Sequence, residues 1–152
     1  MYLAVILALQ SRQVFGYSLS DRVPGELVLT ALRNAWHRHA AAAQTIFHSD
    51  RGNQYASDNF GDALEALQMT VSMSRKGNCW DAIAESFFAT LKSEEITEPY
   101  ENLQAAQRGI ASFIDGFYDP VRLHSSLGYL SPDEDARGMK SAESRPVMRS
   151  VA

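Results

Sequence analysis

The residues from Tyr2 to Leu9 form an unbroken apolar run of the kind that fits a strand covered on both of its faces. A strand with one face in water would instead carry a polar residue at every second position. After a turn near Ser11, a second run from Val14 to Leu19 follows with its large apolar residues on one face. The two runs therefore predict an antiparallel hairpin.

Helical and strand-like patterns alternate along the rest of the chain. Apolar residues recur at helical spacing over residues 24–39, 57–67, 81–98 and 103–117, and short strand-like runs occupy residues 45–47 and 69–73. Ser131-Pro132 can start one more short helix. This order of elements predicts an α/β domain with a mixed sheet.

The last part of the chain has a different composition. Beyond Arg137 it is polar and aperiodic, and its basic residues outnumber its acidic ones. Such a segment buries too little apolar surface to offset the entropy lost on ordering. We therefore expect one domain over residues 1–137 and a disordered tail over residues 138–152.

Length and composition restrict the class of protein. A chain of 152 residues with 45% apolar and 21% charged residues is sufficient for one globular domain with a core. The longest apolar run is too short to span a bilayer, and neither a basic stretch nor a small-residue cleavage site flanks it, so we expect a cytoplasmic protein. The single cysteine, Cys79, excludes an internal disulfide and offers no zinc cluster.

The net charge of -4 is unfavourable for a nucleic-acid binder, because phosphate contacts come from lysine and arginine. It does not exclude one, since a site that cleaves a polymer needs clustered carboxylates. A basic surface can also belong to a segment outside this chain.

Asp50 lies where a strand is expected to end. The run from Thr45 to Phe47 is typical of a buried strand, and the chain then turns polar, with Gly52 to relax the backbone. In open α/β sheets ligands bind in the crevice outside the carboxyl ends of the strands, so a carboxylate at this position is well placed for chemistry. The alternative is that Asp50 only caps a turn.

A second carboxylate, Glu85, lies on the helix expected from residue 81, and Lys92 follows seven residues later on nearly the same face. If this helix crosses the carboxyl edge of the sheet, Glu85 comes close to Asp50. Carboxylates from two elements can hold two magnesium ions, which activate a hydroxyl nucleophile and stabilise the leaving oxygen in phosphodiester cleavage or transfer. The alternative is that Glu85 is an ordinary solvated helix residue.

Four segments resemble, in the right order, the catalytic core of the transposases of insertion-sequence family 3, which are relatives of retroviral integrases. They are His48–Tyr55, Ser72–Asp81, Glu85–Lys92, and Tyr118 together with Arg122–Pro132. The resemblance extends over roughly residues 2–134. It implies a ribonuclease-H-like fold.

The resemblance also implies an Asp-Asp-Glu triad that binds two magnesium or manganese ions, cuts transposon ends and joins them to target DNA. Asp50 matches the second aspartate of the triad and Glu85 matches its glutamate. The partners it implies are DNA and either another copy of the chain or a full-length transposase, with no membrane.

Four basic residues are candidates for contact with DNA. Lys92 matches a position at which integrase relatives carry a lysine that contacts DNA. Arg51, Arg75 and Lys76 are weaker candidates, and for Arg75 and Lys76 an ordinary solvated loop is an equal alternative.

The chain departs from the family pattern in two places. The first aspartate of the family lies on a strand that precedes the hairpin, and no residue here replaces it. Without that strand we expect Tyr2–Leu9 to have unpaired backbone groups, and the chain alone to be poorly stable and inactive. The segment Asp81–Glu85 is also one residue shorter than the family pattern, which rotates Glu85 by about 100° unless the preceding loop compensates.

Two other functions stay open. The chain can act as a non-catalytic fragment that binds DNA or a transposase, either as an inhibitory subunit or as a pseudogene remnant. It can also be a ribonuclease-H-like scaffold with no nucleic-acid role, although that leaves Asp50, Glu85 and Lys92 unexplained.

Overall fold

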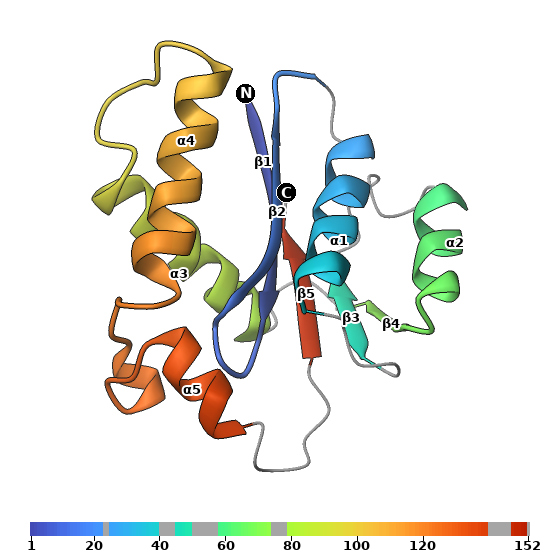
Figure 1. The fold of residues 1–152 in the computed structure, drawn as a ribbon. Helices are drawn as coiled ribbons and strands as arrows, with labels where there is room; N and C mark the ends of the chain where they lie inside the picture. The colour runs from blue at the N-terminus through green and yellow to red at the C-terminus, as the bar shows by residue number, and fades with distance from the viewer. Residues whose placement is uncertain (23–24, 40–44, 50–57, 74–78, 140–146, 152) are drawn as a thin grey trace.

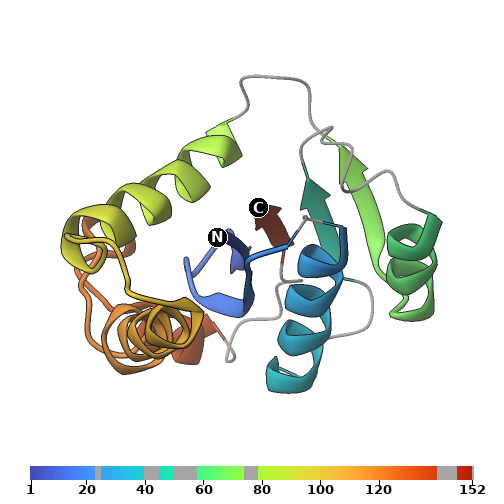
Figure 2. The ribbon, with the colours of Figure 1, turned by 90° about the horizontal axis from the view of Figure 1, so that it is seen from above.

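A computed structural model of the chain describes residues 1–22, 25–39, 45–49, 58–73, 79–139 and 147–151. A five-stranded sheet lies between two layers of helices (Figures 1 and 2). Helices α1 and α2 cover one face of the sheet, and α3 and α4 lie on the other side. The predicted fold class, an α/β domain with a mixed sheet, is confirmed.

The strands are β1 (Tyr2–Ala8), β2 (Val14–Ser20), β3 (Ile46–Ser49), β4 (Thr70–Met73) and β5 (Val147–Val151). The helices are α1 (Gly25–His39), α2 (Asp58–Ala66), α3 (Cys79–Glu94), α4 (Leu103–Phe113) and α5 (Pro132–Met139), with a π-helix η2 (Ile114–Tyr118) and a short 3-10 helix η3 (Ser125–Leu127). The strands are hydrogen-bonded in the order β2-β1-β5-β3-β4. The strands and helices expected before residue 140 therefore form.

Strand β1 is deeply embedded in the core. Ala4 and Ile6 pack into the apolar cluster under α1 and α2, whereas Val5 and Leu7 pack into the cluster under α3, α4 and η2. None of these four side chains is accessible to solvent. The prediction of a strand covered on both faces is confirmed, as is its antiparallel pairing with β2.

Helix α1 lies against β2 so closely that a side chain is excluded at Gly16. A Cβ atom at this position would lie 2.4 Å from the backbone nitrogen of Ala35 and 2.5 Å from the carbonyl oxygen of Ala31. Real Cβ atoms do not approach backbone atoms so closely. Gly16 therefore sets the distance between the hairpin and the helix that covers it.

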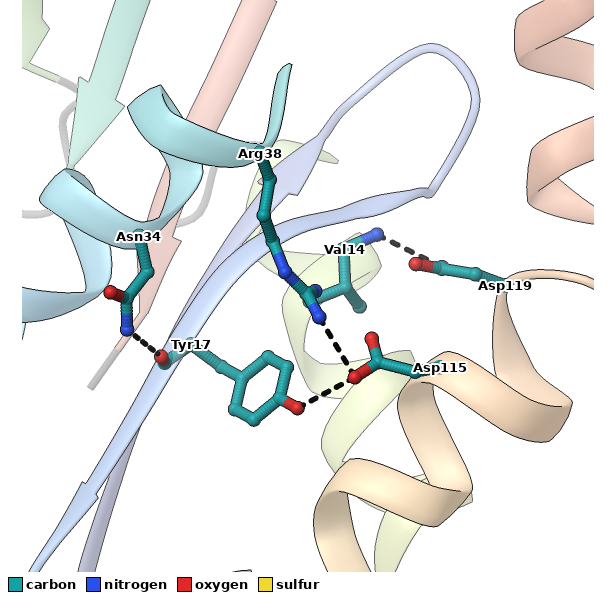
Figure 3. A network of polar contacts seen from close by, with 6 residues as sticks. All are labelled: Val14, Tyr17, Asn34, Arg38, Asp115 and Asp119. Carbon is teal, nitrogen blue, oxygen red and sulfur yellow. Dashed lines mark hydrogen bonds and ion pairs between the residues drawn. The ribbon is translucent and has the colours of Figure 1, made fainter. Parts of the chain in front are cut away.

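The edge of the sheet at β2 is closed by contacts that join the two helical layers (Figure 3). Arg38 of α1 forms an ion pair of 2.8 Å with the Asp115 carboxylate of η2, and the Tyr17 hydroxyl of β2 donates to the same oxygen at 2.9 Å. The Arg38 guanidinium also lies over the Tyr17 ring. Burial, together with the Asp115 carboxylate, raises the pKa of Tyr17 to about 12, so the phenol stays a donor. These contacts cover an edge strand with side chains.

Asp119 directly follows η2, and its side chain ties this part of the chain to the start of β2 (Figure 3). Its side chain is buried, and its carboxyl oxygen Oδ1 accepts the backbone N–H of Val14 at 3.0 Å. Burial raises the pKa of Asp119 to about 8, partly opposed by the Val14 N–H and reinforced by the carboxylates of Asp133 and Asp115. The group is therefore mostly protonated at neutral pH.

The segment that follows η2 holds the end of α3. The Arg122 guanidinium makes a two-pronged contact with the Glu94 carboxylate in the last turn of α3, with Nε and Nη2 at 2.8 to 3.1 Å from its oxygens. His124 is buried edge-on against the Tyr118 ring, which in turn packs edge-on against Phe87 of α3. The segment around Arg122 thereby orients the helix that carries Glu85.

Strand β5 corrects two expectations from the sequence. Residues 147–151 form a strand, not part of a disordered tail; residues 140–146 and 152 lie outside the described residues. We also expected β1 to have an unpaired edge, and this is wrong for Val5–Ala8, which pair with β5. The cause is non-local: two neighbouring strands provide hydrogen-bond partners on both sides of β5, which its own composition does not reveal.

Gly16→Ala should destabilise the chain by about 2 to 4 kcal/mol, because α1 must move away from β2 or distort. The matched control is Gly61→Ala in α2, where a Cβ meets nothing within 4 Å. That substitution should stabilise the chain by about 0.5 to 1 kcal/mol, since alanine favours helix. Urea unfolding measures both, and equal effects of the two substitutions would contradict the close contact at Gly16.

The folded chain should lose stability as the pH rises from about 4 to about 8. The folded pKa of Asp119 is about 8 and the unfolded value is near 4, so the folded state binds the extra proton in this window. At about 1.4 kcal/mol for each pKa unit, the loss amounts to roughly 3 to 6 kcal/mol. Urea unfolding at several pH values should show this slope, and Asp119→Asn should largely remove it. The exposed-site control Asp62→Asn should retain it.

Candidate functional site

Strands β3 and β4 end side by side at one edge of the sheet. They are parallel, and Ser49 at the end of β3 is in register with Met73 at the end of β4. Asp50 directly follows Ser49 in the sequence and itself lies outside the described residues. The backbone therefore confirms the predicted strand before Asp50, and the side-chain position stays a prediction.

The end of β3 is held by a polar contact inside the protein. His48 is buried, and its Nδ1 lies 3.3 Å from the Ser72 hydroxyl oxygen of β4. The two residues are in register on the parallel strands. Sequence reasoning included His48 and Ser72 in motifs but gave them no role, because the contact depends on a pairing across 24 residues. It fixes the strand end immediately before Asp50.

Helix α3 begins beyond the end of β4 and carries Glu85 within its first two turns. Ala84, Phe87 and Leu91 form its buried side against the sheet, whereas Glu85 is exposed. Because β3 and β4 end at the same edge, the connection from β4 to α3 starts on the side of the sheet where Asp50 follows β3. That Asp50 and Glu85 lie close together stays a prediction, because Asp50 is outside the described residues.

Lys92 shares the exposed side of α3 with Glu85. Both side chains are exposed, and seven helical residues separate them by nearly two full turns, or about 10 Å along the axis. The other candidate residues Asp50, Arg51, Arg75 and Lys76 all lie outside the described residues. The structure therefore places Glu85 and Lys92 together and leaves their relation to the other four as a prediction.

The described part of the chain does not assemble a metal site by itself. Among its residues, no group of three or more His, Cys, Asp or Glu side chains could hold a metal ion. Glu85 has no hydrogen-bond or ion-pair partner within the same part of the chain. An exposed carboxylate without a partner is a suitable oxygen ligand for a hard divalent cation, and further ligands must come from elsewhere.

No helix in the described ranges is long and apolar enough to cross a membrane.

Profiles of known protein families match most of the chain. Two family profiles, both described as integrase core domain, match residues 1–79 and residues 67–132. Together they include every element from β1 to the start of α5. The mixed sheet with helices on both faces agrees with the ribonuclease-H-like fold of this family.

Individual relatives agree with the family match. The transposase for insertion sequence element IS904 of Lactococcus lactis is 37% identical over 136 residues, which cover 88% of this chain and 54% of the relative. The transposase InsF for insertion sequence IS3A of Escherichia coli is 38% identical over 136 residues, which cover 88% of this chain and 47% of the relative. The chain thus spans about half the length of these relatives. It belongs to the integrase core domain family, as a core fragment of the type found in the transposases of insertion-sequence family 3.

Proposed function

We propose that this chain serves DNA transposition as part of a transposase core that cleaves and joins DNA strands with the help of divalent metal ions. The observation that carries the proposal is the position of Glu85. Its exposed carboxylate lies on α3, the helix that follows β4 in the sequence, and β4 ends in register with β3, which Asp50 follows in the sequence, in a chain of the integrase core family. Asp50 and Glu85 are then the second and third carboxylates of an Asp-Asp-Glu triad.

The two carboxylates would hold magnesium or manganese. The unpartnered carboxylate of Glu85 fits the oxygen ligand that these cations take, and Asp50 would supply the second ligand. Two such ions, when bound, activate a hydroxyl nucleophile and stabilise the leaving oxygen of a phosphodiester. The contact of His48 with Ser72 would position Asp50, and the contact of Arg122 with Glu94 would position Glu85.

A third carboxylate is needed for this chemistry, and none joins Glu85 within the described residues. We therefore propose that strand transfer depends on an aspartate from outside the described residues. Another copy of the chain or a full-length transposase is the proposed partner in that reaction. The expected location is the cytoplasm.

The lack of a three-ligand cluster among the described residues favours a second, non-catalytic function. A chain with the family fold can bind DNA or a longer transposase without catalysing strand transfer, and so inhibit the transposase. Lys92 is the described residue best placed to bind a phosphate, since it is exposed on the side of α3 that carries Glu85. Arg51, Arg75 and Lys76 are further proposed DNA contacts. The net charge of -4 of the whole chain opposes DNA binding.

Lys92→Ala should weaken binding to duplex DNA of random sequence and reduce the slope of log affinity against log salt by about 1, because one phosphate contact is lost. The matched control is Arg108→Ala, which removes one positive charge from an exposed position of α4. Fluorescence anisotropy over a salt series measures both variants. Absence of binding at low salt would exclude DNA binding by this chain, and equal losses in the two variants would exclude a specific role for Lys92.

Manganese should bind to the chain with an affinity that depends on both carboxylates. Asp50→Asn and Glu85→Gln should each lower that affinity by about tenfold or more, as the loss of a metal ligand does. Electron paramagnetic resonance of free Mn²⁺ measures the binding, and the exposed-site variant Glu98→Gln serves as the control. If Glu85→Gln bound manganese as tightly as the unchanged chain, Glu85 would not be a ligand.

A further inference from the structure

A small cavity lies at the β2 edge of the sheet, between β2 and the second half of α1. It has a volume of about 250 Å³ and is lined by Tyr17, Asn34, His37 and Arg38. Figure 3 shows the side chains of Asn34 and Arg38 reaching from α1 to Tyr17 of β2. We call the cavity that these four residues line the edge hollow. Pockets for drug-sized ligands have about 300 to 1,000 Å³, so the edge hollow fits a smaller chemical group.

The α1 side chains that line the edge hollow offer hydrogen-bond donors. Asn34, His37 and Arg38 are three and four residues apart, so they project from the same side of the helix. The Asn34 amide donates one N–H to the carbonyl oxygen of Tyr17 at 2.9 Å, and its second N–H can serve another acceptor. His37 is exposed and makes no hydrogen bond or ion pair within the described residues.

Arg38 is held in place and still has donors for a further acceptor. Within the described part of the chain its only ion pair uses Nη2, at 2.8 Å from Asp115, and its guanidinium carbon lies 5.2 Å from the centre of the Tyr17 ring. Arg122, by contrast, uses both Nε and Nη2 on Glu94. The guanidinium of Arg38 is therefore already oriented, and its Nε and Nη1 can bind an additional anion.

The charge of α1 near the edge hollow favours an anion. The second half of the helix carries Arg33, His37 and Arg38, whereas its one acidic residue, Glu26, lies in the first turn. Arg33 is exposed one turn before His37 and has no ion-pair partner among the described residues. Two effects oppose the anion, because Asp115 offsets part of the Arg38 charge and the C-terminal end of the helix dipole is negative. The affinity for a single anion should therefore be low.

We infer that the edge hollow binds a phosphate group. The planar fork of Arg38 matches two phosphate oxygens, and the Asn34 amide and the His37 ring can donate to the others. The group can belong to the DNA backbone or to a free phosphate compound, since both present the same oxygens. The edge hollow lies at β2, whereas β4 forms the opposite edge of the sheet and Asp50 follows β3. The inference thus goes beyond the proposed function and does not depend on a metal site.

A titration of the full chain with inorganic phosphate at constant ionic strength tests the site. The side-chain N–H resonances of Asn34 and Arg38, recorded by NMR, should shift in a saturable manner with a dissociation constant on the order of 1 to 10 mM. His37→Ala and Arg38→Lys should each weaken binding by about threefold or more, because each removes a donor. Arg38→Lys keeps a positive charge next to Asp115 and therefore preserves the closed edge; Asn34 reports binding in both variants.

Two control variants and one control salt accompany the titration. Arg108→Lys makes the same exchange at an exposed position of α4 and should leave the phosphate affinity unchanged. Lys92→Ala on α3 should leave it unchanged as well. The inference is overturned if phosphate shifts the Asn34 resonances no more than chloride does at the same ionic strength. It is also overturned if His37→Ala and Arg38→Lys both bind phosphate as tightly as the unchanged chain.

Duplex DNA distinguishes the two sources of the phosphate group. If the DNA backbone is the source, His37→Ala and Arg38→Lys should lower the affinity for duplex DNA by a similar factor in fluorescence anisotropy. If a free phosphate compound is the source, the two variants should weaken only the binding of inorganic phosphate. Neither measurement involves a metal ion, Asp50 or Glu85, and the phosphate titration is decisive even for a chain that binds no DNA. Failure here is therefore distinct from failure of the proposed function.

Discussion

The backbone of β1 imposes the constraint on which the rest of this sheet depends. From Ala4 to Ala8 its side chains are buried on both faces, so the N–H and C=O groups of this part cannot all be satisfied by water. They need a paired strand on each edge, and β2 provides one of them. The other edge is paired by a strand from the end of the chain, and that strand also brings β3 and β4 into the sheet.

The helical layers are attached to this sheet at a few well-defined points. Gly16 permits the close approach of α1 on one face. Arg38 and Asp115 join the two layers around the β2 edge, and Asp119 fixes the end of η2 to β2 (Figure 3). Arg122 then holds the last turn of α3. The C-terminal motif that resembles the transposase signature therefore has a structural role in the described chain: it orients the helix that carries Glu85.

Features that depend on neighbours in the sequence could be predicted, and those that depend on distant pairing could not. The hairpin and the helices follow from apolar periodicity, and the position of Glu85 on α3 follows from a motif. Strand β5 does not, because its five residues include Arg149 and Ser150 and its partner Val5 lies at the other end of the chain. The pairing of Arg122 with Glu94 spans 28 residues and likewise leaves no local signal. The roles of Asp50 and Glu85 come from the resemblance and stay predictions.

The most direct test of this account is hydrogen–deuterium exchange of the full chain, read out for individual backbone amides. If β5 completes the sheet, the amides of Val147–Val151 that pair with neighbouring strands should be protected, and those of β1 should be protected with them. The account would be contradicted if β5 exchanged at the rate of an unfolded peptide while the β1–β2 hairpin stayed protected. The sheet would then lack its central strand, and β3, the strand before Asp50, would not be joined to β1.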